Sequence, residues 1–198
     1  MQSRSLRGEQ IDQLYQEHLC RDFPPDERKP LAQIHRAVDR GIYRVVGFYR
    51  EDALCGYALL SVLPGRRFGF LDYFAVVPQM RGGGIGGQLL ADLRRQMADL
   101  QGIFFEVEQP QSAPDPQQAA RRIRFYQRGG CRYTGVYTRL FGVNYYILYL
   151  PCAGDADDET LLVEVEASYR AMVDPALYDQ KVAIWRQAPP ADGRCIQQ

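Results

Sequence analysis

The sequence predicts a mixed α/β protein with a mostly antiparallel sheet flanked by helices, and three observations lead to this fold class. Helical and strand patterns follow one another in the order ααβββαβαββ, without the repeated strand–helix units of a doubly wound sheet. Short turns join several consecutive strands, which favours antiparallel pairing. A glycine-rich run at 82–87 separates a strand from a helix near mid-chain. At 198 residues, the chain fits one domain with an appendage.

Two helices are expected before the sheet. Apolar residues recur at helical spacing over 10–22, and Phe23-Pro24-Pro25 ends that pattern. A second helical pattern covers 26–39, with Gly41 as its stop.

Three strands follow these helices, at 43–50, 53–62 and 68–77. Glu51-Asp52 makes the turn of a hairpin between the first two, and a turn at 63–67 leads into the third. The third strand is long and apolar and runs directly towards the glycine run.

The second half of the predicted domain alternates helices and strands. A helix is expected at 88–97, a strand at 103–108 and a Pro- and Gln-rich loop at 109–118. Within that loop, Asp115-Pro116 offers an N-cap followed by proline at the first helical position. The helix that follows stops at Gly129-Gly130. Strands at 132–141 and 145–150 then form a hairpin around Gly142-Val143-Asn144.

An acidic run at 155–159 marks a boundary, so we expect a domain at 1–152 and a helical extension at 153–198. Apolar residues recur at helical spacing in the extension. The longer predicted helix carries Leu161, Leu162, Val165, Tyr169, Met172 and Val173, and the shorter one carries Leu177, Tyr178, Val182 and Trp185. These faces must be buried. Burial on the protein's own core and burial across a homodimer are both open.

Composition narrows the function classes. Lys plus Arg and Asp plus Glu both number 24, so the formal net charge is zero and nothing indicates nucleic-acid binding. No apolar run reaches the roughly 20 residues that span a membrane, and the N-terminus lacks a signal-peptide pattern. The five cysteines are scattered, which indicates a reduced, cytoplasmic protein. The two histidines lack ligand spacing, so no metal site is expected.

The glycine run 82–87 is typical of a phosphate-binding loop. The N–H groups at the start of a helix, together with its dipole, favour an anion, and glycines let the backbone approach it. A Walker loop is excluded because no Lys-Ser or Lys-Thr follows. A dinucleotide fingerprint can be matched with Gly82, Gly84 and Gly87, but the surrounding strand–helix repeats are missing. The third interpretation, a pyrophosphate loop of the form Gln/Arg-x-x-Gly-x-Gly/Ala, fits residues 81–86 best.

This loop resembles that of the GNAT superfamily of N-acetyltransferases, and Phe74-Ala75-Val76-Val77-Pro78 resembles the family's lead-in to it. A second stretch, 121–131, is similar to the family's helix that ends in Phe/Leu-Tyr-x-x-x-Gly-Phe. Cys131 stands where Phe is usual. The resemblance covers about residues 10–150. It implies a splayed sheet of the acetyltransferase type, with the two N-terminal helices forming one wall of the substrate cleft.

The resemblance implies acetyl-CoA as co-substrate and no metal. The residues implied to hold the cofactor are Phe74, Ala75, Val76, Arg81, Gly82, Gly83, Gly84, Ile85, Gly86, Gly87 and Tyr126. The backbone N–H of Val76 would polarise the thioester carbonyl. Tyr126 would protonate the leaving thiolate, since a phenol with a pKa near 10 is neutral beforehand.

Two carboxylates are candidates for the base that deprotonates the amine. Glu106, in Phe105-Glu106-Val107-Glu108, resembles the glutamate of the Leu-Glu-Val strand in ribosomal-protein N-terminal alanine acetyltransferases. Asp72, on the strand before the glycine run, is the rival. Strand alternation places Asp72, Phe74 and Val76 on one face.

The resemblance thus implies an N-acetyltransferase that acts on a primary amine of a small molecule or of a peptide or protein N-terminus. A non-catalytic acyl-CoA sensor on the same fold is one alternative. A nucleotide-dependent oxidoreductase is another, and cofactor binding distinguishes the two classes.

Overall fold

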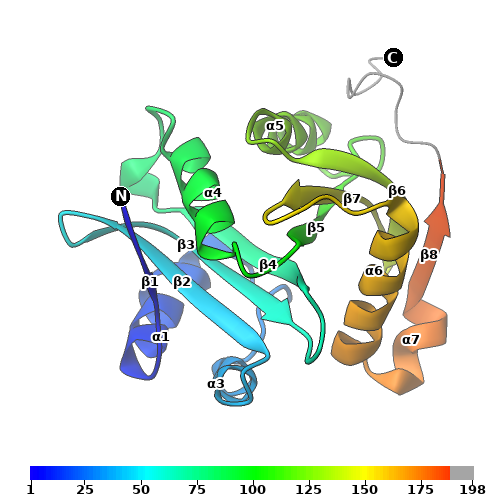
Figure 1. The fold of residues 1–198 in the computed structure, drawn as a ribbon, viewed down its shortest axis with the longest axis horizontal. Coiled ribbons are helices and arrows are strands. Elements are labelled where there is room, and N and C mark those ends of the chain that lie inside the picture. Colours follow the sequence, from blue (N-terminus) through cyan, green and yellow to red (C-terminus); the bar gives the residue numbers. More distant parts are fainter. Residues whose placement is uncertain (188–198) are drawn as a thin grey trace. The chain divides into compact units, whose positions relative to one another are not determined.

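The computed structural model describes residues 1–187, and the chain forms two compact units, Met1–Gln96 and the part from Met97 onward (Figure 1). The end of the predicted extension, with Cys195, lies outside the described residues. Both units are helices packed on antiparallel strands, which confirms the predicted mixed α/β class. The unit boundary falls inside the segment predicted as one domain, and the proposed division at 152 stays a prediction.

The first unit is a four-stranded antiparallel sheet in the order β1-β2-β3-β4. Its strands are β1 (Gln2–Ser5), β2 (Tyr43–Arg50), β3 (Ala53–Val62) and β4 (Phe68–Val76). Its helices are α1 (Glu9–Leu14), continued by a π-helical turn (Tyr15–Leu19) and α2 (Cys20–Asp22), then α3 (Leu31–Asp39) and α4 (Ile85–Gln96). Strands β2, β3 and β4 agree closely with the sequence prediction. Strand β1 was not predicted, because four mostly exposed residues leave no apolar pattern.

Two helix predictions in this unit are corrected. The helix predicted for 26–39 begins only at Leu31, after Pro30, because proline restricts the residue before it to extended conformations. Helix α4 begins at Ile85 and not at Gln88, so Gly86 and Gly87 belong to its first turn.

The core of the first unit lies between the N-terminal helices and one face of the sheet. Ile11, Leu14 and Ile34 from the helices pack with strand residues that include Tyr57 and Leu59. Helix α4 contacts β3 and β4, where Gly56 faces it. Since Gly56 and Tyr57 are consecutive strand residues, α4 covers the opposite face.

The second unit has the strand order β5-β7-β6-β8, again antiparallel throughout. Its strands are β5 (Gly102–Glu108), β6 (Arg132–Leu140), β7 (Val143–Pro151) and β8 (Val182–Arg186). Its helices are α5 (Pro116–Arg128), α6 (Asp158–Met172) and α7 (Pro175–Lys181). Asp115 caps α5 by accepting from the backbone N–H of Gln118 at 2.9 Å, as predicted.

Two predictions in the second unit are wrong. The β6–β7 turn consists of Phe141-Gly142 alone, both with positive φ, and Val143 and Asn144 are already in the strand. The second C-terminal helix ends at Lys181, and Val182 and Trp185 lie in β8, which pairs with β6. The apolar spacing of this short segment fits a helix and a strand equally, and the open edge of β6 decides between them.

Helix α6 packs on its own chain, beside β6 and β8 (Figure 1). Leu161, Val165 and Tyr169 are fully buried within the single chain. The predicted burial is therefore confirmed for these three residues without a second subunit. It is wrong for Leu177 and Trp185 of the shorter predicted helix, which are exposed in the single chain. A homodimer through these helices stays a prediction. Within residues 1–187, no helix is both long and apolar enough to cross a bilayer.

Candidate active site

The glycine loop joins β4 to α4 through three consecutive glycines with positive φ. The φ angles of Gly82, Gly83 and Gly84 are 93°, 55° and 76°, and no atom beyond the adjacent residues would lie within 4 Å of an added Cβ at any of them. Backbone conformation, and not lack of space, is therefore what requires glycine here. Successive N–H groups in such a turn form a concave anion-binding surface.

The first turn of α4 adds further donors to this loop. The N–H of Ile85 bonds the carbonyl of Gly82 at 3.3 Å, which closes the loop onto the helix. Gly86 and Gly87 fall in the first turn, where backbone N–H groups have no intrahelical acceptor. The helix dipole also favours negative charge at this end, so the loop has the geometry of a phosphate site.

Arg81 connects the loop to the end of β4. Its Nε donates to the carbonyl oxygen of Val76 at 3.3 Å, while the side chain remains exposed. Phe74, Ala75 and Val76 are all half-buried at this end of the strand. The segment implied to hold the pantetheine arm and the loop implied to hold the pyrophosphate are thus neighbours in the first unit.

Close packing of α4 on β3 depends on Gly56. A Cβ at Gly56 would lie 2.4 Å from Cδ1 of Leu89 and 2.4 Å from the carbonyl oxygen of Ala75. Any side chain would therefore push α4 away from the strand pair and move the glycine loop with it.

Asp72 is an ion-paired, buried carboxylate. Its side chain is 6% exposed, Nζ of Lys29 lies 2.9 Å from Oδ1, and the Tyr43 hydroxyl donates to Oδ2 at 2.5 Å. Burial and the negative charge of Asp72 raise the pKa of Tyr43 well above its usual value, so Tyr43 remains a neutral donor.

The predicted alternation along β4 is interrupted at Asp72. Leu71 and Tyr73 face consecutive residues of β3, which leaves Asp72 as the extra residue of a β-bulge. Asp72 and Tyr73 consequently both reach the segment before α3, where the Tyr73 hydroxyl accepts from the N–H of Lys29 at 2.8 Å.

Tyr126 lies in the last turns of α5 and packs against β5. Its ring centroid is 4.4 Å from that of Phe105 and 5.0 Å from that of Phe125. Burial in this aromatic surrounding raises the pKa of the Tyr126 phenol to about 12. The group is therefore protonated at neutral pH, as an acid must be before it acts.

Glu106 lies on β5 next to Phe105, and the two side chains point to opposite faces of the strand. Its Oε1 accepts a hydrogen bond from the hydroxyl of Tyr169 on α6. The second unit thus holds both predicted acid–base residues, with Tyr126 on the α5 side of β5 and Glu106 on the α6 side.

Comparison with protein-family models assigns this chain to a family. The model of the acetyltransferase (GNAT) family matches residues 10–130, more than half of the chain. The chain belongs to the GNAT acetyltransferase family. The predicted family and acetyltransferase class are thereby confirmed. A search of curated protein sequences gave no match.

Solved structures agree with this GNAT assignment at the level of the fold. A Bacteroides thetaiotaomicron protein assigned to the GNAT acetyltransferases aligns with a TM-score of 0.68 and 23% identity, over 87% of this chain and 97% of the other. The Escherichia coli ribosomal-protein-S18-alanine N-acetyltransferase aligns with a TM-score of 0.57 and 18% identity, over 79% and 97%. Spermidine N-acetyltransferase from Vibrio cholerae, in complex with CoA and spermine, aligns with a TM-score of 0.57 and 12% identity. The alignment covers 77% of this chain and 95% of the other.

Sequence reasoning missed the partners of both GNAT base candidates. Lys29 and Tyr43 bind Asp72 from distant positions, and Tyr169 binds Glu106 from beyond the matched family region. Tyr169 had a sequence signal only as one apolar position in a helical pattern. In residues 1–187, no group of three or more His, Cys, Asp or Glu side chains is arranged to hold a metal ion.

Proposed function

We propose that this GNAT chain transfers the acetyl group of acetyl-CoA to a primary amine, on a small molecule or at a peptide or protein N-terminus. The observation that carries the proposal is the glycine loop, with three positive-φ glycines leading into the N-terminus of α4. In this proposal, the loop and Arg81 bind the pyrophosphate. The backbone N–H of Val76 polarises the thioester carbonyl, and Phe74 and Ala75 line the pantetheine arm.

Glu106 is the base in this proposal, and Asp72 has a structural role. An alkyl ammonium with a pKa of about 10 must lose a proton before it attacks the carbonyl carbon. Both oxygens of Asp72 are engaged, one by a lysine cation and one by a phenol, so the carboxylate connects β4 to β2 and to the segment before α3. Glu106 accepts the ammonium proton, directly or through water, before the C–N bond forms. The nitrogen loses its second proton as the amide is formed, which balances the proton that the thiolate gains.

Tyr126 donates the proton to the thiolate as the C–S bond breaks. A thiol in water has a pKa of about 8.5, so a phenol with a pKa of about 12 would be a reluctant donor to a hydrated thiolate. Exclusion of water raises the basicity of a thiolate as well, because burial disfavours the charged form. The burial of Tyr126 therefore suits a leaving group that is released in a dry environment.

The choice of acceptor to test is guided by the resemblance of the Glu106 strand to that of the N-terminal alanine acetyltransferases. The structural neighbours whose names give a substrate include N-acetyltransferases of a ribosomal-protein alanine, of spermidine and of an aminoglycoside. A peptide with an N-terminal alanine is therefore the first acceptor to test, and a polyamine is the second. The reduced, cytoplasmic setting stays a prediction.

The deciding experiment is an amine panel incubated with acetyl-CoA and followed by thiol release. We expect thiol release above the rate of acetyl-CoA hydrolysis with at least one primary amine. Binding of acetyl-CoA without release on any amine would favour the non-catalytic sensor. Stabilisation by NADH and not by CoA would reject the acetyl-CoA proposal.

A further inference from the structure

The starting observation is a hydrogen bond between the C-terminal extension and the proposed base. The hydroxyl of Tyr169, on α6, donates to Oε1 of Glu106, on β5. Tyr169 is fully buried, with 0% of its surface exposed. The family match ends at residue 130, so this contact comes from a part of the chain that the match does not cover.

Thr138 is the third residue in this series of hydrogen bonds, and its hydroxyl must act as the donor to Tyr169. A phenol has one hydrogen, and the Tyr169 hydroxyl gives it to the carboxylate. The Thr138 hydroxyl, 2.9 Å away, must then donate to the phenol oxygen. Burial and the charge of Glu106 raise the pKa of Tyr169 well above its usual range, so the phenol stays a neutral donor. Among the described contacts, the polar groups that face Tyr169 include Thr138 on β6, Glu106 on β5 and Tyr145 on β7.

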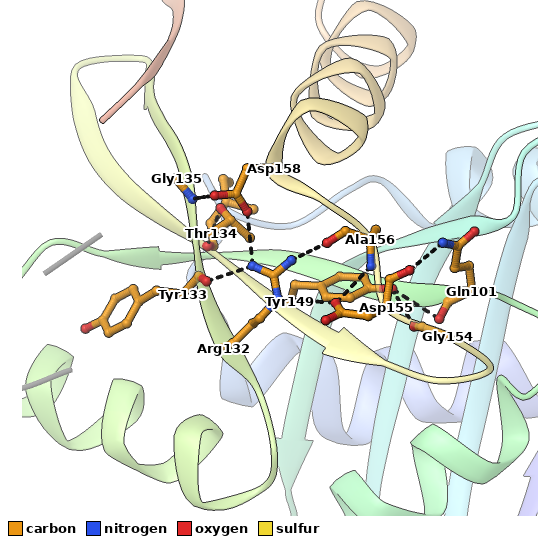
Figure 2. A network of polar contacts seen from close by, with 11 residues as sticks. Gln101, Arg132, Tyr133, Thr134, Gly135, Tyr149, Gly154, Asp155, Ala156 and Asp158 are labelled. Carbon is orange, nitrogen blue, oxygen red and sulfur yellow. Dashed lines mark hydrogen bonds and ion pairs between the residues drawn. The ribbon is translucent and has the colours of Figure 1, made fainter. Parts of the chain in front are cut away.

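Helix α6 is held in place by a polar cluster at its N-terminus (Figure 2). Nη1 of Arg132 donates to Oδ1 of Asp158 at 3.0 Å, and Nη2 donates to the carbonyl oxygen of Ala156. The guanidinium carbon also lies 5.3 Å from the centre of the Tyr149 ring. Tyr149 donates to the carbonyl oxygen of Gly154 at 3.0 Å. Arg132 and Tyr149 therefore fix the segment that leads into α6.

A bulge in β6 provides the second attachment. The register shifts between Tyr133 and Tyr137, and the N–H of Gly135 is directed to Oδ2 of Asp158 at 2.8 Å. A Cβ on Gly135 would lie 2.7 Å from that oxygen, so glycine allows this close approach. With its first turn bound to β6, and with Leu161 and Val165 fully buried, α6 has a fixed position that carries Tyr169 to Glu106.

We propose that Tyr169 is a positioning residue for Glu106, so that the C-terminal extension completes the catalytic apparatus. This inference rests on the proposed function, in which Glu106 is the base. The hydroxyl fixes the carboxylate and keeps it ionised, because a hydrogen bond to the charged form favours that form. A base must be ionised in the free enzyme, so Tyr169 extends the active pH range towards acid.

The test titrates Glu106 directly and needs no acceptor. The full-length protein is labelled with glutamate carrying ¹³C at the carboxyl carbon, and the Glu106 signal is assigned by its loss in Glu106→Gln. In Tyr169→Phe, we expect the titration midpoint of Glu106 to rise by about one pH unit, the scale of one hydrogen bond to a charged group. With an acceptor from the amine panel, a second measurement becomes possible: the acidic limb of the kcat/KM profile should move by the same amount, with KM for acetyl-CoA unchanged.

Tyr57→Phe is the matched control. Tyr57 is also fully buried, and its hydroxyl donates to the carboxylate of Asp22 at 2.9 Å, in the first unit. This variant loses the same kind of hydrogen bond but should leave the Glu106 midpoint in place. Thr138→Val is a second route if Tyr169→Phe folds poorly. It removes the hydroxyl that polarises Tyr169, so the midpoint should rise by less and in the same direction.

The outcomes separate this inference from the proposed function. In one outcome, the Glu106 midpoint is unchanged in Tyr169→Phe, while Glu106→Gln still flattens the acidic limb of the kcat/KM profile. This result would overturn the role of Tyr169 and keep Glu106 as the base. In another outcome, the acidic limb of the kcat/KM profile is unchanged in Glu106→Gln. This result would reject Glu106 as the base and, with it, the positioning role of Tyr169. A rise of the midpoint in Tyr57→Phe equal to that in Tyr169→Phe would show a general loss of packing and would also overturn the inference.

Discussion

The hydroxyl of Tyr43 donates to Oδ2 of Asp72 at 2.5 Å, while Lys29 occupies the other oxygen at 2.9 Å. These two contacts connect β2, β4 and the segment before α3 through one buried carboxylate. They give Asp72 a structural reason to be charged in an otherwise apolar strand. Asp72 and Glu106 therefore differ in their surroundings, and this difference can be tested.

Asp72→Asn should destabilise the protein. The variant keeps the size of the Asp72 side chain but removes the charged partner of Lys29, whose side chain is three-quarters buried. We expect a loss of about 1–3 kcal/mol in the free energy of unfolding, measured by urea denaturation. Asp52→Asn is the control, because the Arg4–Asp52 ion pair is exposed and should contribute little. Equal stability of the two variants would contradict the structural role of Asp72.

Glu106→Gln should remove the proposed base without changing the shape of the side chain. We expect kcat to fall on the order of 10²-fold and the acidic limb of the kcat/KM profile to flatten. Asp72→Asn should keep the acidic limb of the kcat/KM profile, even though this variant is expected to be less stable. If Asp72→Asn flattens the limb and Glu106→Gln does not, the two roles are reversed.

Tyr126→Phe tests the proposed acid. We expect kcat to fall on the order of 10²-fold, with little change in the affinity for CoA. Since the pKa of Tyr126 is about 12, its deprotonation should cause no loss of kcat between pH 7 and about 10. Tyr57→Phe is a matched control, because burial also raises the pKa of Tyr57 and its hydroxyl bonds Asp22, outside the residues assigned to the site. A kcat that is unchanged in Tyr126→Phe with a good acceptor would leave Tyr126 a packing residue.

Gly84→Asp should abolish stabilisation by acetyl-CoA. A ligand at a hundred times its Kd stabilises the folded state by about 2.7 kcal/mol, so wild-type protein should melt at a higher temperature when acetyl-CoA is added. The carboxylate would repel the pyrophosphate, and the φ of 76° would strain the loop. Gly65→Asp is the control, with a φ of 72° and open space around it, in a different turn of the first unit. This control should lose stability to a similar degree but keep its response to acetyl-CoA, and a lost response there would argue against the glycine loop as the site.

Gly135→Ala should loosen the attachment of α6. The added methyl group would meet the Asp158 carboxylate at 2.7 Å, which is too close for carbon and oxygen, so Asp158 must leave its place. We expect faster amide hydrogen exchange in the first turns of α6 and a loss of about 1 kcal/mol in stability. Gly154→Ala is the control, because a Cβ there would lie 3.7 Å from the Gln101 side chain, an ordinary contact. Unchanged exchange in Gly135→Ala would show that α6 is held mainly by its apolar face.

The sequence determined those parts of the protein that depend on local patterns. Strands β2, β3 and β4 appear where alternation and turn residues predicted them, and Asp115 caps α5 as expected. The glycine loop could also be predicted, because a positive φ strongly favours glycine at Gly82, Gly83 and Gly84. These features could be predicted because the physical cause lies within a few residues of the effect.

Tertiary structure decided what depends on residues that are far apart in the chain. Val182 and Trp185 form a strand because β6 offers them backbone partners, although their spacing also fits a helix. Asp72 is engaged because Lys29 and Tyr43 reach it across the first unit. Tyr169 meets Glu106, 63 residues earlier, because α6 is attached to β6 at Gly135. A sequence pattern shows which residues can be buried, but the hydrogen-bond partners of a buried polar group are chosen only when the elements pack.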